Sequence, residues 1–262
     1  MIFDTHAHYD DHAFDEDREE LLSGLSESGI GSVVDVCADM DDLDRILALA
    51  ERFKTVYASV GVHPSNVASL NEDHMELLKR ACDNPKVVAV GEIGLDYHYR
   101  LEDDPSETDP PRDVQKKWFI RQLELAKETG MPVIIHSRDA TADTLEIMRD
   151  AHSHGITGVI HCFSGSAETA KEYLKMGYYL GIGGVITFKN GRVLREVVEV
   201  SPMEKLVIET DCPYLAPVPH RGKRNDSRYL PLVVKAVSDI KGISEEEVIR
   251  ITEENAKRLY RL

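Results

Sequence analysis

Short apolar runs alternate with amphipathic segments along the whole of this 262-residue chain. Eight runs are rich in Val and Ile and long enough for buried parallel strands: residues 2–6, 32–38, 55–63, 87–96, 132–137, 157–163, 178–184 and 205–211. Helical patterns occupy residues 15–28, 40–53, 72–82, 114–129, 140–151, 167–176, 191–200, 230–240 and 244–260. This alternation favours a closed α/β barrel, a (β/α)8 TIM barrel formed by residues 1–262 as a single domain, over an open doubly wound sheet.

One segment, residues 96–113, breaks the alternation because it is acidic, rich in proline and without periodicity. In a barrel it would emerge on the face where the strands end. Two interpretations are open: an insertion on the surface, which we favour, or a lid over a site at that face.

The charge balance restricts how a polyanion could bind. The net charge is −16, and all of the excess acid lies in residues 1–131. Such a protein repels polyanions at long range, so a nucleic-acid substrate would need a local basic surface.

Composition also indicates a cytoplasmic protein. No apolar run approaches the roughly 18 residues that cross a bilayer, and the first residues lack the pattern of a signal peptide. The four cysteines contain no C-x-x-C pair and are expected to be reduced thiols. We therefore expect no contact with a membrane, and nothing in the sequence points to an obligate protein partner.

Metal-binding side chains stand at the ends of five predicted strands: His6, His8, Glu92, His136, His161 and Asp211. Alternate residues of a strand point to one face, so His6 and His8 can converge on one ion. Burying six such groups without a cation would be costly. The carboxyl ends of barrel strands meet at one rim, and we therefore predict a metal site there.

Five motifs resemble those of the TatD family of metal-dependent deoxyribonucleases, which belongs to the amidohydrolase-like metallohydrolases. They are H-x-H at 6–8, GEIGLDYH at 91–98, VIIHSRDA at 133–140, VIHCFSGS at 159–166 and ETDCPYLAPVPHRGKRN at 209–225. The resemblance covers residues 4–259 and implies a (β/α)8 barrel that holds one to three divalent cations, of which we expect two per chain. The acidic segment after Tyr99 is longer than the usual connection of the family.

The resemblance also implies an assignment of ligands. One ion would be bound by His6, His8, Glu92 and Asp211, and the second by Glu92, His136 and His161, with Glu92 as the bridge. Histidine and carboxylate ligands suit Zn, Mg or Mn equally. Two cations would lower the pKa of a bound water. We predict Asp211 and Glu92 as catalytic residues, with Asp211 accepting the proton of that water.

Further side chains are predicted to contact the substrate: His63, Arg138, His220, Arg221, Lys223 and Arg224. The last four form the densest basic stretch of the chain and directly follow the segment of Asp211. A loop in that position lies at the rim, where barrels often bind phosphate. Glu209 would point to the same face as Asp211 but deeper, and we interpret it as structural.

Three hypotheses about function follow. The resemblance implies a divalent-metal-dependent hydrolase that cleaves phosphodiester bonds in DNA, as a 3′–5′ exonuclease on single strands. The alternative is a metal-dependent hydrolase of an ester or amide bond, such as a D-aminoacyl-tRNA deacylase. A barrel that holds metal without catalysis is disfavoured by the six ligand positions and the basic loop.

Overall fold

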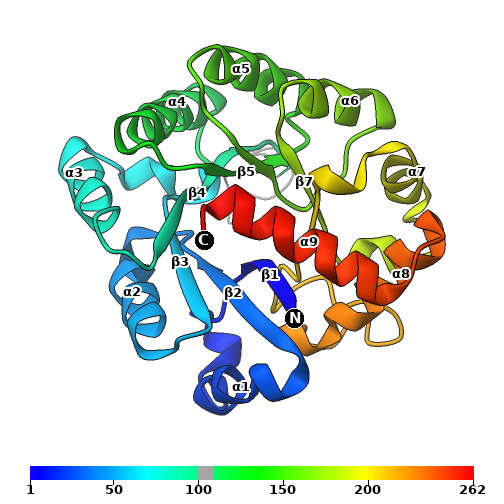
Figure 1. Ribbon diagram of the computed structural model, residues 1–262. Helices are drawn as coiled ribbons and strands as arrows, with labels where there is room; N and C mark the ends of the chain where they lie inside the picture. Colours follow the sequence, from blue (N-terminus) through cyan, green and yellow to red (C-terminus); the bar gives the residue numbers. More distant parts are fainter. Residues whose placement is uncertain (99–108) are drawn as a thin grey trace.

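The apolar runs form parallel strands, each paired with the next one along the chain, in the computed structural model (Figure 1). The structure describes residues 1–98 and 109–262. Within these ranges a sheet of eight strands runs in the order β1 to β8. The strands are β1 Ile2–Ala7, β2 Ile30–Val36, β3 Val56–Val60, β4 Val87–Asp96, β5 Val133–Arg138, β6 Gly158–Ile160, β7 Tyr179–Ile182 and β8 Leu206–Ile208.

Hydrogen bonds between β1 and the segment after β8 close the sheet. The Asp211 N–H donates to the His6 carbonyl at 2.9 Å, and the His8 N–H donates to the Cys212 carbonyl at 2.8 Å. Ala7 and Cys212 form a parallel bridge between these bonds. The predicted (β/α)8 barrel is confirmed, and its closure holds His6 on β1 and His8 just after it beside Asp211.

A ring of helices surrounds the strands (Figure 1). The α-helices are α1 Arg18–Gly24, α2 Leu43–Arg52, α3 Glu72–Ala81, α4 Arg112–Thr129, α5 Thr141–Ser153, α6 Ala167–Lys175, α7 Arg192–Val200, α8 Leu230–Lys241 and α9 Glu245–Tyr260. Each of α2 to α8 buries apolar side chains on one face, such as Ile46, Met148 and Val197, which are fully buried. This burial against the strands is the main force that fixes the ring.

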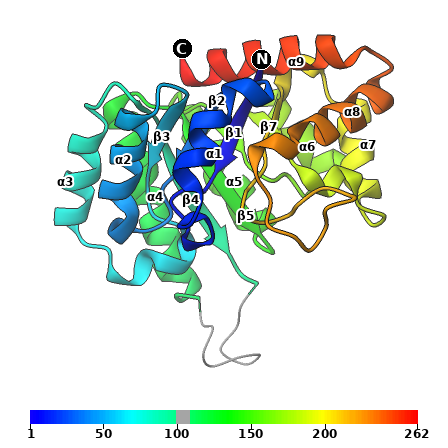
Figure 2. The ribbon, with the colours of Figure 1, turned by 90° about the horizontal axis from the view of Figure 1, so that it is seen from below.

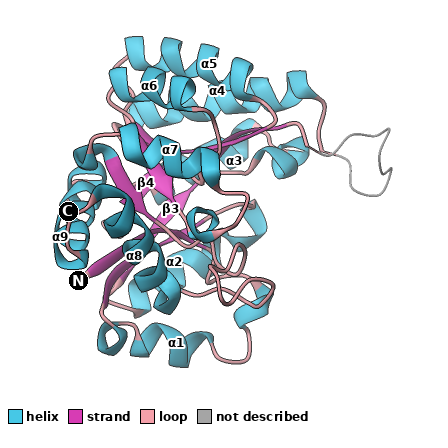
Figure 3. Ribbon diagram, turned by 90° about the vertical axis from the view of Figure 1, so that its right-hand side faces the viewer, coloured by secondary structure: helices cyan, strands magenta, loops and turns pink. Residues whose placement is uncertain are grey.

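Helix α9 covers one end of the barrel, the end at which the strands begin (Figures 1 and 2). The Ser244 hydroxyl caps its first turn by accepting the Glu247 N–H at 3.2 Å. The Tyr260 hydroxyl donates to the Thr5 carbonyl at 2.9 Å, and the Asn255 amide donates to the Leu206 carbonyl at 2.7 Å. Seen from the side, α9 and both termini lie together at this end (Figure 3). The carboxyl ends of the strands therefore face the opposite end of the molecule.

Four strands are shorter than the apolar runs predict: β3, β6, β7 and β8 end at residues 60, 160, 182 and 208. The backbone leaves the sheet there, and it enters the left-handed region at Cys162 (φ 43°) and Asp211 (φ 57°). His63, His161 and Asp211 consequently lie on loops just after the strands rather than inside them. A periodic pattern does not reveal where the sheet hydrogen bonds stop, because most residues that follow these strands are buried as well, including the polar Glu209 and Thr210.

The acidic segment is only partly described. Asp96 closes β4, and Arg112 and Asp113 already belong to α4, so the irregular part is shorter than 96–113. The interpretations of this segment as an insertion or a lid fall on residues 99–108, which lie outside the described residues. Among the described residues, no helix is long and apolar enough to cross a membrane.

Candidate metal centre

The six predicted ligands come together at the end of the barrel opposite α9. Glu92 lies at their centre, on β4, and its side chain is buried, with the residue 3% exposed. Its Oε2 atom is 3.4 Å from His6 Nε2 and 3.8 Å from His8 Nε2. Its Oε1 atom is 2.7 Å from His136 Nδ1 and 3.0 Å from His161 Nε2. The two oxygens of one carboxylate thus face two different pairs of imidazoles.

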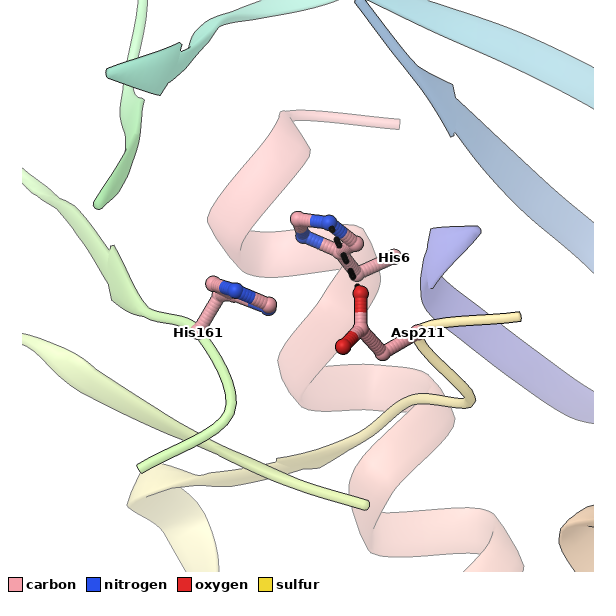
Figure 4. Close-up of side chains that lie close together, drawn as sticks. All are labelled: His6, His161 and Asp211. Atoms are coloured by element: carbon pink, nitrogen blue, oxygen red, sulfur yellow. Dashed lines mark ion pairs between the residues drawn. The ribbon is translucent and has the colours of Figure 1, made fainter. Parts of the chain in front are cut away.

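Asp211 contacts the first of these pairs. Its Oδ1 atom is 3.7 Å from His6 Nε2 and 3.6 Å from His8 Nε2. Figure 4 shows the side chains of His6, His161 and Asp211 converging from β1, from the loop after β6 and from the loop after β8. The rings of His6 and His161 stack at 3.8 Å between centroids. His6 is therefore shared by the groups around both Glu92 oxygens.

Three of these histidines have an acceptor next to one ring nitrogen, on the side away from the cluster. Their other ring nitrogen therefore faces the cluster. His8 Nδ1 lies 2.9 Å from the Val36 carbonyl. His161 Nδ1 lies 3.2 Å from Glu209 Oε1, and His136 Nε2 lies 2.9 Å from Asp96 Oδ2. An acceptor at one ring nitrogen takes its N–H and leaves the lone pair of the other nitrogen for a metal ion.

Close backbone approach lets β4 and β5 bring these groups together. At Gly94 φ is +147°, and a Cβ atom would lie 2.0 Å from the His136 carbonyl oxygen. Only glycine satisfies both conditions, because any side chain would collide with backbone. Below the cluster, Glu209 accepts the Cys162 N–H at 2.5 Å and so fixes the turn that carries His161. The sequence interpretation of Glu209 as structural agrees with these contacts.

The electrostatics of the cluster favour ionised carboxylates. Burial opposes the charge of Glu92, but the surrounding histidines, His161 foremost, hold its pKa well below the usual value. For Asp211, burial is likewise outweighed by the neighbouring histidines, His8 foremost, and its pKa is lowered. Burial also disfavours the charged form of His8, yet Asp211 and Glu92 raise its pKa to about 10. The carboxylates therefore attract positive charge, which protons supply here and metal ions can supply instead.

His63 differs from the other histidines. Burial and the neighbouring His136 lower its pKa to about 3, so the ring is neutral. Its Nδ1 atom accepts the Ser65 N–H at 3.2 Å, which leaves the proton on Nε2. Nε2 lies 3.9 Å from Glu92 Oε1 and is a donor rather than a free lone pair. This geometry favours the predicted role of His63 as a substrate contact over ligation.

The donor set fits divalent cations. Three overlapping groups have ligand atoms within 4.8 Å of one another: His6, His8 and Glu92; His6, His161 and Asp211; His63, Glu92 and His136. Imidazole nitrogens mixed with carboxylate oxygens match zinc, manganese and related ions. All six predicted ligands belong to at least one of these groups.

A cavity of about 790 Å³ opens above the cluster. Among the predicted contacts, His63 and Arg138 line it. Asp10, Arg45 and Tyr214 also line it, and the sequence interpretation missed them. Asp10 continues the alternation of His6 and His8, which is a signal that could have found it. Arg45 lies on α2, and no local pattern connects that helix with the site.

The basic stretch of the β8–α8 loop is not part of the described cavity lining. His220 stacks on Tyr229 at 4.1 Å, and the Arg221 guanidinium lies over the Phe188 ring at 4.5 Å. Arg224 forms two hydrogen bonds with the Asp17 carboxylate, at 2.6 and 2.8 Å. This ion pair engages the Arg224 guanidinium within the chain, and its contact with the substrate stays a prediction. The roles of His220, Arg221 and Lys223 stay predictions.

A parallel α/β barrel with imidazoles and carboxylates gathered at the carboxyl ends of its strands is the architecture of metal-dependent hydrolases. The chain belongs to one family of this class: the family model TatD related DNase matches residues 3–261.

Relatives and solved structures agree with this assignment. The chain is 42% identical over 262 residues to YabD of Bacillus subtilis, with 100% of both chains covered. It is 37% identical over 265 residues to TatD of Mycobacterium tuberculosis, with 100% of this chain and 98% of the relative covered. Both relatives are described as uncharacterized metal-dependent hydrolases. The crystal structure of YJJV, a TatD homologue from Escherichia coli, superposes with a TM-score of 0.90 at 30% identity, covering 100% and 98% of the two chains.

Proposed function

We propose that the chain is a two-cation hydrolase that cleaves phosphodiester bonds in DNA and removes nucleotides from the 3′ end of single strands. The observation that carries this proposal is the position of Glu92, whose two oxygens face separate pairs of imidazoles. A carboxylate in this position can bridge two ions. The family description as DNase supports a phosphodiester substrate.

In this proposal His6, His8, Glu92 and Asp211 hold one cation, and Glu92, His136 and His161 hold the other. When bound, two ions of Zn, Mg or Mn would supply Lewis acidity, which would activate water and neutralise charge on the phosphoryl group. Asp211 is ionised because its pKa is lowered, and it accepts the proton of the attacking water.

The remaining roles concern the substrate. The neutral His63 donates from Nε2 to a phosphate oxygen, and the Arg138 guanidinium, which lines the same cavity, attracts the phosphate charge. The cavity of about 790 Å³ is large enough for a nucleotide at the end of a strand.

We also propose a cytoplasmic location, where the four free thiols would stay reduced. Cell fractionation tests this location.

The test uses purified protein freed of metal and reloaded with Zn, Mg or Mn in separate samples. Single-stranded DNA, double-stranded DNA and RNA are labelled at either end and incubated with each sample. We expect release of mononucleotides from the 3′ end of single-stranded DNA with at least one metal, and no release by Asp211→Asn. Absence of cleavage with every metal, together with hydrolysis of an aminoacyl-tRNA ester, would replace the proposal with the alternative hydrolase.

A further inference from the structure

Tyr214 presents an exposed aromatic ring at the mouth of the cavity. It lies on the β8–α8 loop and lines the cavity next to Leu215. It is 55% exposed, and among the large hydrophobic side chains exposed in the described residues it is the only aromatic one. Leaving such a ring in water has a cost, which a planar ligand would remove.

The Tyr214 ring is held at both ends. Its hydroxyl donates to Asp11 Oδ2 at 3.0 Å. Its backbone N–H donates to the Asp211 carbonyl at 2.9 Å, and its carbonyl accepts the Asn225 side-chain amide at 2.8 Å. The same amide of the buried Asn225 also donates to the Thr210 carbonyl at 2.9 Å. The ring position is therefore fixed relative to Asp211 before any substrate binds, which lowers the entropy lost on binding.

The surroundings of the ring suit a base better than a phosphate. Asp11, which accepts the Tyr214 hydroxyl, repels phosphate groups at the ring itself, whereas the Arg45 guanidinium lies beside Asp10 and donates to its carbonyl at 2.8 Å. Arg138 is the last residue of β5, which is four strands from β1 in the barrel order, so it lies across the mouth from Asp11. A strand lying across the mouth would direct its phosphates toward Arg138 and its bases toward Tyr214.

We propose that Tyr214 stacks on the nucleobase next to the scissile bond and so positions the end of the strand over the metal centre. This inference rests on the proposed function and identifies the residue that recognises the base. Stacking on an aromatic face is tolerant of sequence, because every base has a π-face. The enzyme would consequently require a base at that position without selecting which one.

The experiment combines variants with modified substrates. Tyr214→Ala removes the ring, whereas Tyr214→Phe keeps the ring and loses the bond to Asp11. Val218→Ala is the matched control, since Val218 lies on the same loop, is 45% exposed and is not part of the described cavity lining. The substrates are single-stranded oligonucleotides in which one abasic residue is moved along the strand.

We expect Tyr214→Ala to lower kcat/KM on intact DNA about tenfold, mainly through KM, at unchanged metal content. Tyr214→Phe should stay within about threefold of the parent, and Val218→Ala should equal it. In the parent, an abasic residue at one position should cause a similar loss. In Tyr214→Ala the same abasic residue should cause no further loss, because the stacking partner is already absent.

The outcomes separate this inference from the function on which it rests. Parent-like cleavage by Tyr214→Ala would overturn the stacking role. So would a fall in kcat/KM, for the variant acting on the abasic substrate, that equals the product of the two separate losses. Loss of metal by Tyr214→Ala would overturn it too, since the ring would then be structural. If the parent cleaves no DNA with any metal, the proposed function has failed, and the inference falls with it.

Discussion

Glu92 occupies the position on which most of the cluster depends. It is buried, and its charge is maintained only because five imidazole rings lie within 4 Å of its oxygens. Those rings are in turn oriented by groups behind them, such as Asp96 behind His136 and Glu209 behind His161. A change at Glu92 therefore affects both halves of the cluster, whereas a change at His136 affects only one.

Glu92→Gln should do more damage than His136→Ala. The amide keeps the size of the carboxylate but removes the negative charge that offsets two neighbouring cations. We expect Glu92→Gln to lower metal occupancy at both positions and kcat by about 100-fold or more, given that loss of even an orienting partner costs 10–100-fold. His136→Ala should lose about half of the metal. Metal analysis by mass spectrometry and kinetics on the same samples measure both effects.

Circular dichroism provides the control, because both variants should keep the spectrum of the parent. A Glu92→Gln protein with its full metal content and parent-like turnover would show that Glu92 is not the bridge. The assignment of both ions would then have to be redrawn.

Among the elements, the loop between β8 and α8 combines one basic residue that contacts the rest of the fold with two that form no ion pair in the described part of the chain. Arg224 connects it to Asp17 at the beginning of α1, and it also lies over the Phe14 ring. Arg221 and Lys223 form no ion pair among the described residues. The three cations of one sequence motif are therefore expected to respond differently to substitution.

The double variant Arg221→Ala/Lys223→Ala should weaken binding to single-stranded DNA and keep its melting temperature. If both residues contact phosphates, the slope of log K against log salt should fall in magnitude by about 1.4. Arg224→Ala should instead lower the free energy of unfolding by up to about 1 kcal/mol, because a partly exposed ion pair contributes little more. Fluorescence anisotropy over a salt series and thermal melts measure the two effects.

An unchanged salt slope in the double variant would show that Arg221 and Lys223 are not phosphate contacts. An unchanged slope in Arg224→Ala is expected, and it serves as the internal control. A steeper loss of DNA binding in Arg224→Ala than in the double variant would show that Arg224 is the main phosphate contact of the loop.

The elements themselves were predictable from sequence to different degrees. The number, order and type of strands and helices follow from local periodicity, and so do residues such as Ser244 that begin a helix. The ends of β3, β6 and β8 were not predictable, because buried residues continue into the loops, where the backbone becomes left-handed at Cys162 and Asp211. The partners that orient a side chain were not predictable either. Asp17 and Arg224, which form an ion pair, are far apart in the chain.

In the whole molecule, the two ends of the barrel differ in composition: one is closed by apolar packing, and the other carries the polar cluster. At one end, α9 packs on the interior of the sheet, with Leu259 and Tyr260 buried against residues such as Phe3. At the other end, polar groups from several strands meet around a cavity. The sequence could predict the second end because ligand-type residues recur at strand ends. It could not predict Tyr214 or Arg45, since their part in the cavity depends on the closed barrel.

Because the cluster draws on β1, β4, β5 and the loops after β6 and β8, bound metal should stabilise the fold as a whole. A ligand at 100 times its Kd adds about 2.7 kcal/mol to the free energy of unfolding. At about 2–4 °C per kcal/mol for a chain of this size, removal of metal should lower the melting temperature by about 5–10 °C. Calorimetry of chelated and reloaded protein measures the shift, which should grow with metal concentration.

His154→Ala, a change at an exposed histidine after α5, should keep the full shift, and Glu92→Gln should lose most of it. An equal shift in Glu92→Gln and the parent would mean that the stabilising ion binds elsewhere on the molecule.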